Sequence, residues 1–180
     1  MSNKDLIAAA FEKMMATMFI DDISVKDIMN ECNLPRTVFY RYFHDKYDLM
    51  AYVYSNAIEK QLNNKANYSY SDVVKVCYSY MYEKKNFFNK VVKYKNQNSF
   101  LQFLYEYSYK TTYDAICKSF HFRQLDNKSD CSLRLYCHGC TSLAEWWLET
   151  GLKMPVEQIC EVIVDSVPSC LKEYFDNMIY

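Results

Sequence analysis

Glycine and proline are scarce in this 180-residue chain, which contains two glycines and three prolines. The two residue types together make up about 12% of an average protein. β-Sandwiches, β-barrels and glycine-rich phosphate-binding loops need them at their turns, so their scarcity argues against these architectures. Collagen-like and low-complexity chains are excluded as well. A protein built from long helices is what the composition favours.

The chain also lacks a large net charge and long apolar runs. The chain has 21 Lys and Arg against 22 Asp and Glu, which gives a formal net charge of −1. This balance excludes a domain that holds nucleic acid by bulk positive charge, but it allows a small local contact surface. No apolar run approaches the ~18 residues of a membrane span, and charged residues interrupt the N-terminal segment where a secretory signal would be apolar. We therefore expect a cytoplasmic protein without a membrane partner.

The eight cysteines are expected to remain reduced in the cytosol and to behave as small hydrophobic residues. Cys137 and Cys140 form a CxxC pair, the spacing of a thiol redox pair or of half a metal site. A second ligand pair is missing, and both cysteines lie on the apolar stripe of an expected helix. The pattern favours packing, and we expect no metal and no cofactor. A redox or metal sensor is the alternative interpretation of this pair.

Apolar residues recur at three- and four-residue spacing along most of the chain, which is the pattern of amphipathic helices. The expected fold is therefore all-α. The expected helices cover residues 3–18, 24–32, 36–43, 45–64, 71–82, 87–92, 99–120, 133–151 and 155–167, with a last helix that ends near residue 178.

The helices at 24–32 and 36–43 have the features of a helix–turn–helix. Ser24 followed by Asp27 is typical of a capping box. Asn33 tolerates the left-handed conformation that ends a helix, and Leu34 is an apolar residue that fits between two helices. Asp45 is expected to cap the helix that follows.

The helix at 36–43 is expected to bury one face and to offer the other to the major groove of DNA. Phe39 and Phe43 lie on the inward side of the pattern. Arginine reads guanine through two hydrogen bonds, and threonine and tyrosine bond base edges or phosphates. The outward side carries all three residue types, at Arg36, Thr37, Tyr40 and Arg41.

This segment resembles the DNA-binding domain of the TetR family of bacterial transcriptional regulators. The resemblance rests on residues 24–28 and 37–49, where Tyr40, Phe43, Lys46 and Leu49 follow one another at three-residue intervals. It implies a helix–turn–helix domain at residues 1–47 that binds double-stranded operator DNA. It also implies a helical bundle at residues 48–180 that forms the dimer and senses an effector.

By the same resemblance, individual residues match the DNA contacts of the family. Ser24, Tyr40, Tyr42 and Lys46 match phosphate contacts, and Arg36, Thr37 and Arg41 match base contacts. The chain departs from the family pattern at Asn33, Pro35 and Val38, where glycine, a capping Ser or Thr, and threonine are usual. Because Pro35 has no capping side chain, we expect Asn33 to cap the third helix and Pro35 to lie in its first turn.

The C-terminal half resembles one branch of the same family. The resemblance lies in residues 143–151, with a tryptophan pair and Gly151, and in Pro155, which opens the next helix. That branch includes a regulator of dihydroxyacetone kinase genes that is controlled by a protein partner. The resemblance therefore allows control either by a small-molecule effector or by a protein partner.

The apolar stripes of the C-terminal helices predict two further sites. A mainly apolar effector cavity is expected between the helices at 45–64, 99–120 and 133–151, with Phe103, Tyr107 and Trp146 as candidate ligand contacts. Arg123 and Arg134 are the only arginines beyond residue 41, which favours a neutral or cationic, largely apolar effector. The width of the stripes in 133–148 and 156–167 predicts a homodimer interface, with Leu143, Trp147, Ile159 and Ile163 as candidates.

The function favoured by these patterns is a sequence-specific transcriptional regulator, expected to be a repressor whose effector changes the spacing of its two recognition helices. Ser-His-Asp sets, HExxH motifs and glycine-rich phosphate loops do not occur, so we expect no enzyme. The alternative is a helical protein-interaction module whose helix–turn–helix no longer binds DNA. The non-basic N-terminal domain favours that alternative, and the retained Arg36, Thr37, Tyr40 and Lys46 argue against it.

Overall fold

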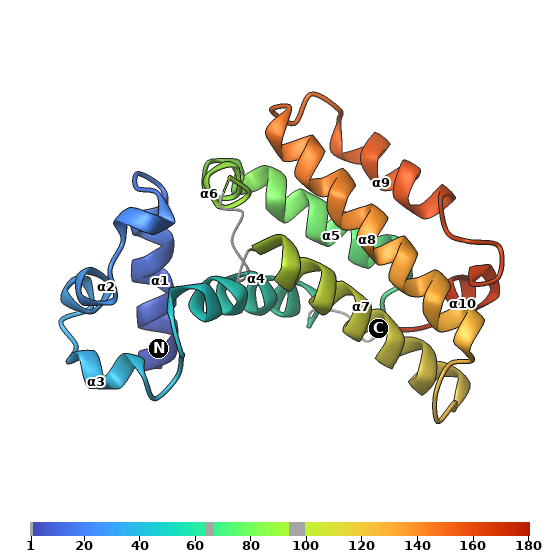
Figure 1. Ribbon diagram of the computed structural model, residues 1–180, viewed down its shortest axis with the longest axis horizontal. Coiled ribbons are helices and arrows are strands. Elements are labelled where there is room, and N and C mark those ends of the chain that lie inside the picture. Colours follow the sequence, from blue (N-terminus) through green and yellow to red (C-terminus); the bar gives the residue numbers. More distant parts are fainter. Residues whose placement is uncertain (1, 64–66, 94–99) are drawn as a thin grey trace.

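The computed structural model describes residues 2–63, 67–93 and 100–180. All regular secondary structure in these residues is helical, with a small helical unit at one end and a helical bundle at the other (Figure 1). The predicted all-α fold with an N-terminal helix–turn–helix is therefore confirmed. None of the described helices is long and apolar enough to span a membrane.

The N-terminal unit consists of α1 (Asn3–Met15), α2 (Val25–Glu31) and α3 (Arg36–Phe39), with a 3₁₀ turn, η1 (Ile20–Asp22), after α1. Helix α4 (Lys46–Leu62) runs from this unit into the bundle (Figure 1). Helix α7 packs along α8, and α5 packs along α9. The bundle helices are α5 (Tyr70–Glu83), α6 (Lys85–Val91), α7 (Phe100–Phe120), α8 (Asn127–Glu149), α9 (Val156–Asp165) and α10 (Lys172–Asn177).

Capping side chains determine where several helices begin. The Ser24 hydroxyl accepts the Asp27 backbone N–H at 3.1 Å, and the Asp27 carboxylate accepts the Ser24 backbone N–H at 3.0 Å. This reciprocal pair is the predicted capping box. The hydrogen bond from Ser24 holds the pKa of Asp27 below its ordinary value of 3.8, so the cap is charged at neutral pH. Asp45 likewise caps α4, as predicted, by accepting the backbone N–H groups of Tyr47 and Asp48.

The turn between α2 and α3 closes in the predicted way. Asn33 has a φ of 54°, in the left-handed region. Its N–H donates to the Asn30 carbonyl at 3.1 Å, and the Leu34 N–H donates to the Met29 carbonyl at 3.0 Å. These two bonds form a Schellman closure, which asparagine can make without glycine. The turn therefore holds α3 at a fixed angle to α2.

The third helix differs from the prediction in length and in its cap. Regular α-helix is limited to Arg36–Phe39. Some of the next residues bond to the carbonyl three positions earlier instead of four, as the Tyr42 N–H does to the Phe39 carbonyl at 2.9 Å. Pro35, and not Asn33, is the N-cap residue, and it makes no capping bond. Asn33 is not available as a cap because its left-handed backbone ends α2.

Smaller differences occur at other helix boundaries. Asp126 accepts the backbone N–H groups of Lys128 and Ser129, so α8 begins at Asn127, six residues before the predicted start at residue 133. Helix α5 begins one residue before the predicted Ser71 because Ser69 caps it. The predicted start of α7 at Ser99 lies outside the described residues.

One hydrophobic core continues from α1 to α10. Tyr54 of α4 is buried at its centre, with ring centroids of Tyr80, Phe88 and Phe100 at 5.4–6.1 Å. The predicted domain boundary at residue 47 falls in the first turn of α4, and the division into two domains stays a prediction. Helix α4 thus packs against α1 at one end and against α5 and α7 in the bundle.

Helix α6 makes a second connection between the bundle and α1. The Lys90 ammonium donates to the carbonyls of Met15 and Ala16 at 3.1 and 3.0 Å, at the C-terminal end of α1. Lys84 pairs with Glu12 at 2.7 Å, and the Phe87 ring packs edge-on against Phe11. The orientation of α1 relative to the bundle is therefore set by polar and aromatic contacts together.

Candidate nucleic-acid interface and effector cavity

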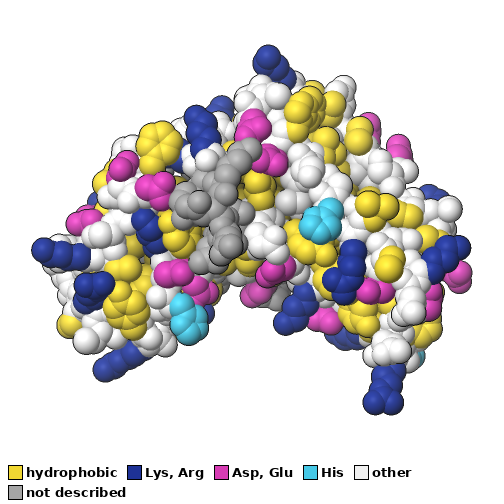
Figure 2. Space-filling model, viewed as in Figure 1, with side chains coloured by type: hydrophobic (Ala, Val, Ile, Leu, Met, Phe, Trp, Pro, Cys, Tyr) yellow, Lys and Arg dark blue, Asp and Glu magenta, His cyan; other side chains and the backbone are white. Residues whose placement is uncertain are grey.

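Most of the predicted DNA contacts are exposed on α3 and on the residues that directly follow it. Phe39 and Phe43 are buried on the opposite side, as predicted. Figure 2 shows Lys and Arg side chains projecting at the end of the molecule where α2 and α3 lie. The exposed predicted contacts are Ser24, Arg36, Thr37, Tyr40, Arg41 and Tyr42.

Arg36 and Tyr40 form an ordered pair on this face. One guanidinium nitrogen of Arg36, Nη2, donates to the Tyr40 hydroxyl at 2.9 Å. The guanidinium carbon also lies 5.6 Å from the centre of the Tyr40 ring. A guanidinium has five N–H donors, so this pairing orients the group while most of its donors remain available to a ligand. Such a fixed, exposed guanidinium suits two-bond recognition of guanine.

Lys46 is bound differently from the other predicted contacts. Its ammonium donates to the backbone carbonyls of Ile20, Asp21 and Ile23, the last at 3.0 Å. An ammonium has three donors, so these bonds account for all of them. Lys46 thus ties the η1 turn to the beginning of α4, and its charge is not presented freely as a phosphate contact would require.

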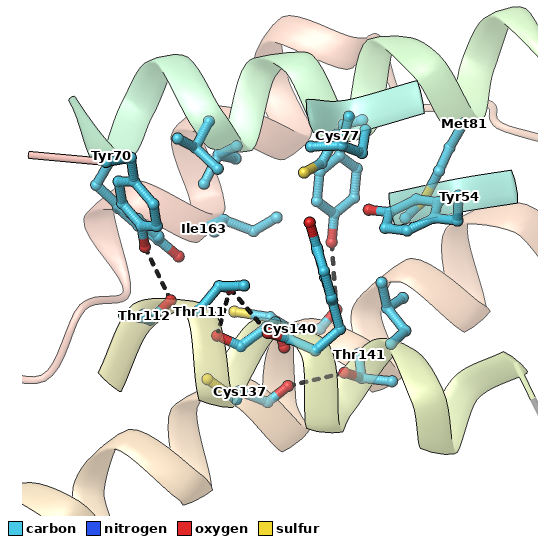
Figure 3. Close-up of a pocket in the computed structure, with 18 of the residues that line it drawn as sticks. Tyr54, Tyr70, Cys77, Met81, Thr111, Thr112, Cys137, Cys140, Thr141 and Ile163 are labelled. Atoms are coloured by element: carbon cyan, nitrogen blue, oxygen red, sulfur yellow. Dashed lines mark hydrogen bonds between the residues drawn. The ribbon is translucent and has the colours of Figure 1, made fainter. Parts of the chain in front are cut away.

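A cavity of about 140 Å³ lies inside the bundle. Residues of α4, α5, α7, α8 and α9 form its wall, together with Tyr180 at the C-terminus (Figure 3). The predicted position between α4, α7 and α8 is therefore occupied by a cavity, and α5 and α9 complete it. Among the described residues, no Lys, Arg, Asp or Glu side chain lines this space.

Hydroxyl groups in the cavity wall are mostly hydrogen-bonded to one another or to the backbone. Among the described residues, the Tyr54 hydroxyl is instead paired with the Cys77 thiol, and the hydroxyl of Tyr107, whose ring lines the cavity, has no hydrogen-bond partner. The bonded pairs are Tyr70 with Tyr136 at 2.9 Å, Tyr136 with the Ile163 carbonyl at 2.6 Å, Tyr78 with the Cys140 carbonyl at 3.2 Å and Thr112 with Tyr180 at 2.8 Å.

Comparison with known proteins identifies the family. Residues 68–168 match a TetR C-terminal family described as "Transcriptional regulator C-terminal region". The chain belongs to the TetR family of transcriptional regulators. Members of this family bind DNA and typically act as dimers.

The name DhaS occurs both for a curated relative of this TetR-family regulator and for a solved structure with a similar fold. The HTH-type dhaKLM operon transcriptional activator DhaS of Lactococcus lactis subsp. lactis (strain IL1403) is 28% identical over 87 residues, which are 48% of this chain and 46% of that relative. The matched part thus spans less than half of the curated relative. A solved structure of the dihydroxyacetone kinase operon activator DhaS superimposes with a TM-score of 0.65 at 18% identity, covering 94% of this chain and 96% of that one.

A second solved structure has the same fold. A TetR-family transcriptional regulator from Streptomyces coelicolor gives a TM-score of 0.59 at 15% identity, covering 91% of this chain and 80% of that one. The predicted resemblance to the family, and to the branch that includes the dihydroxyacetone kinase regulator, is confirmed. DhaS is called an activator in both comparisons, and the repressor role predicted for this regulator stays a prediction.

Only one of the three predicted ligand contacts lines the cavity of the regulator. Tyr107 is in the wall, whereas Phe103 packs behind it with the two ring centroids 5.5 Å apart. Trp146 is 48% exposed on the outer face of α8, and the adjacent Trp147 is fully buried, with its indole N–H donating to the Met154 carbonyl at 2.8 Å. Neighbouring helical positions differ by about 100° in direction, so only one of the two tryptophans can face the core.

The contribution of α5 to the cavity was not expected from the sequence. Tyr70, Cys77 and Tyr78 line the space from this helix. Together with Val74 and Met81 of the same helix, they recur at three- and four-residue spacing. This is the spacing of an ordinary core stripe, so no feature of the sequence distinguishes a stripe that borders a cavity from one that is fully packed.

The predicted dimer residues lie mainly in the core of the chain, and the dimer interface stays a prediction. Trp147, Ile159 and Ile163 are buried within the chain, because α8 packs on α7 and α9 packs on α5, and Leu143 is half-buried. These stripes therefore serve the core of one subunit. The large apolar side chains that α8 and α9 expose are Leu135, Trp146 and Val162, at 75%, 48% and 45%.

Cys137 and Cys140 both lie in the cavity wall with free thiols. Burial raises the pKa of the Cys137 thiol to about 12 and that of the Cys140 thiol to about 11. Thiols with such values stay protonated at neutral pH, and the protonated form is neither a good nucleophile nor a metal ligand. Within the described parts of the chain, no group of three or more His, Cys, Asp or Glu side chains is arranged to hold a metal ion.

Proposed function

We propose that this regulator binds operator DNA as a homodimer through the outer face of α3 and the N-terminus of α2, and that a small molecule in the bundle cavity controls this binding. The observation that carries the proposal is the exposed Arg36–Tyr40 pair on a helix whose opposite face is buried. In this proposal Arg36, Thr37 and Arg41 read bases, and Ser24, Tyr40 and Tyr42 contact phosphates.

The outer face of α8 is the proposed dimer interface. Leu135, Gly139 and Trp146 lie on one exposed side of this helix. Glycine inside a helix costs about 1 kcal/mol relative to alanine, and a Cβ at Gly139 would meet no atom within 4 Å. Nothing inside the subunit therefore requires glycine there, whereas close approach of a second helix would. A two-fold dimer also fits a palindromic operator with half-sites ~34–36 Å apart.

Helix α4 is the proposed route from effector to DNA. Tyr54, Ile58 and Leu62 of this helix line the cavity, and its first residue, Lys46, holds the η1 turn of the DNA-binding unit. A ligand that fits one position of α4 better than another shifts the population of the two positions. The cavity favours a small molecule over a protein partner as the effector, because a surface contact with a protein does not need an internal space.

The test of this proposal is a salt titration of the full-length protein against the DNA that flanks its own gene. We expect a dimer on one site, with affinity at least about 10³-fold above that for scrambled DNA. The salt dependence should be modest for the class, because only three Lys or Arg fall within residues 36–46. Equal affinity for flanking and scrambled DNA would instead support a protein-interaction module.

Replacing Lys46 with methionine separates its two possible roles. We expect a loss of about 1.5–3 kcal/mol in the free energy of unfolding, because three carbonyls lose a charged donor. The salt slope of DNA binding should not change, since the ammonium is already bonded within the chain. Urea unfolding and the salt titration measure the two quantities. A slope lowered by ~1 with unchanged stability would make Lys46 a phosphate contact after all.

A further inference from the structure

The geometry of the cavity points to a compact, uncharged ligand about the size of one aromatic ring, which forms a single hydrogen bond with the Tyr107 hydroxyl. This inference rests on the proposed role of the bundle as the effector site. It names the chemical class of the effector and the residue that selects it.

The size of the space limits the ligand. The cavity measures about 140 Å³, and an engineered apolar protein cavity of about 150 Å³ binds benzene. A single six-membered ring with one small substituent therefore fills the space. A fused or linked pair of rings exceeds this volume.

The lack of charged side chains in the described wall excludes ionic ligands. An ion that enters this space leaves its hydration shell, and none of the described side chains around it carries a compensating charge. The two arginines of the bundle do not supply one. Arg134 is engaged outside the cavity by Asp130 at 3.0 Å, and by the Tyr109 hydroxyl at 2.7 Å, while Arg123 is exposed after the end of α7.

The polarity of the wall limits the ligand to one hydrogen-bonding group. Ile58, Val74, Met81 and Leu104 give the cavity an apolar surface, and most of its other hydroxyls are already paired. Tyr107 offers an unpaired hydroxyl, and its ring is held between Phe103 at 5.5 Å and Tyr54 at 6.0 Å. The position of this hydroxyl is therefore fixed, and a ligand with one hydroxyl or carbonyl in reach gains a bond that a plain hydrocarbon cannot make.

The experiment compares three probes of similar size: phenol, fluorobenzene and benzoate. Each is titrated calorimetrically into the full-length protein and into Tyr107→Phe, which removes one hydroxyl and keeps the ring. Tyr105→Phe is the matched control, because Tyr105 is on the same helix but stacks on His138 outside the cavity. We expect wild type and Tyr105→Phe to bind phenol about tenfold more tightly than fluorobenzene. Benzoate should not bind measurably.

In Tyr107→Phe the preference for phenol should disappear while fluorobenzene binding is kept. The inference is overturned if no neutral probe binds wild type, if benzoate binds as tightly as phenol, or if Tyr107→Phe retains the preference. Operator binding by the same preparations keeps the two proposals apart. Specific DNA binding without probe binding refutes only the ligand class, and probe binding without specific DNA binding refutes the proposed function.

Discussion

Replacing Arg36 with alanine should weaken operator binding at least about 30-fold while leaving the helical fold unchanged. One good two-bond contact with a base contributes ~1–3 kcal/mol, and a dimer makes the contact at both half-sites, which gives about 2–6 kcal/mol in total. The side chain is exposed, and its hydrogen bond is to another exposed residue, Tyr40, so its loss removes little from the core. Fluorescence anisotropy with labelled operator measures the affinity, and circular dichroism reports the fold.

Two variants make this result specific. Arg123→Ala removes an exposed arginine from the far end of the bundle and should bind operator as wild type does. Tyr40→Phe keeps the ring and removes the hydroxyl that orients the guanidinium, so a smaller loss is expected. The assignment of Arg36 to base reading is wrong if Arg36→Ala and Arg123→Ala bind the operator equally well.

The tryptophan pair of α8 should respond in opposite ways to alanine substitution. Trp147→Ala is expected to lower the free energy of unfolding by about 3–5 kcal/mol, the usual cost of truncating a fully buried large aromatic side chain. The loss also leaves the Met154 carbonyl without its indole donor. Trp146→Ala should change the stability of the subunit by less than about 0.5 kcal/mol, because this ring lies on the surface.

Dimerisation should show the reverse order. Trp146→Ala is expected to weaken self-association, since its ring belongs to the proposed interface, and sedimentation over a range of concentrations measures this. Urea unfolding is compared at one low protein concentration, because dimer formation stabilises the folded chain by mass action. Equal effects of both variants on self-association would place the interface away from the outer face of α8.

Local signals in the sequence were sufficient to locate the helix–turn–helix. Ser24 with Asp27, Asn33 and Asp45 each determine a boundary through bonds to the backbone of the next few residues. Such contacts depend on residues close in the chain, so they can be predicted without the tertiary structure. Pro35 shows the limit of this reasoning, because the candidate cap Asn33 was already used to close α2.

The candidate sites in the bundle were less predictable because they depend on contacts between distant segments. The spacing of Trp147, Ile159 and Ile163 shows that they are apolar stripe residues, but not whether the same chain or a second copy covers them. Tyr107 was predicted in the cavity, whereas Tyr54, Tyr70 and Tyr78 had no distinguishing signal. The cavity arises from the way five helices pack together, so the apolar spacing within any one helix does not predict it.

The contacts of Lys84 and Lys90 with α1 bear on how this regulator can be recombined with others. A graft that exchanges only residues 1–47 would bring a foreign α1 whose C-terminal carbonyls and acidic side chain need not match these two lysines. Chimaeras in which α6 is exchanged together with the DNA-binding unit should therefore retain effector control more often than chimaeras in which only residues 1–47 are exchanged. Compatibility between α1 and α6 would then restrict which DNA-binding units this bundle can accept during evolution.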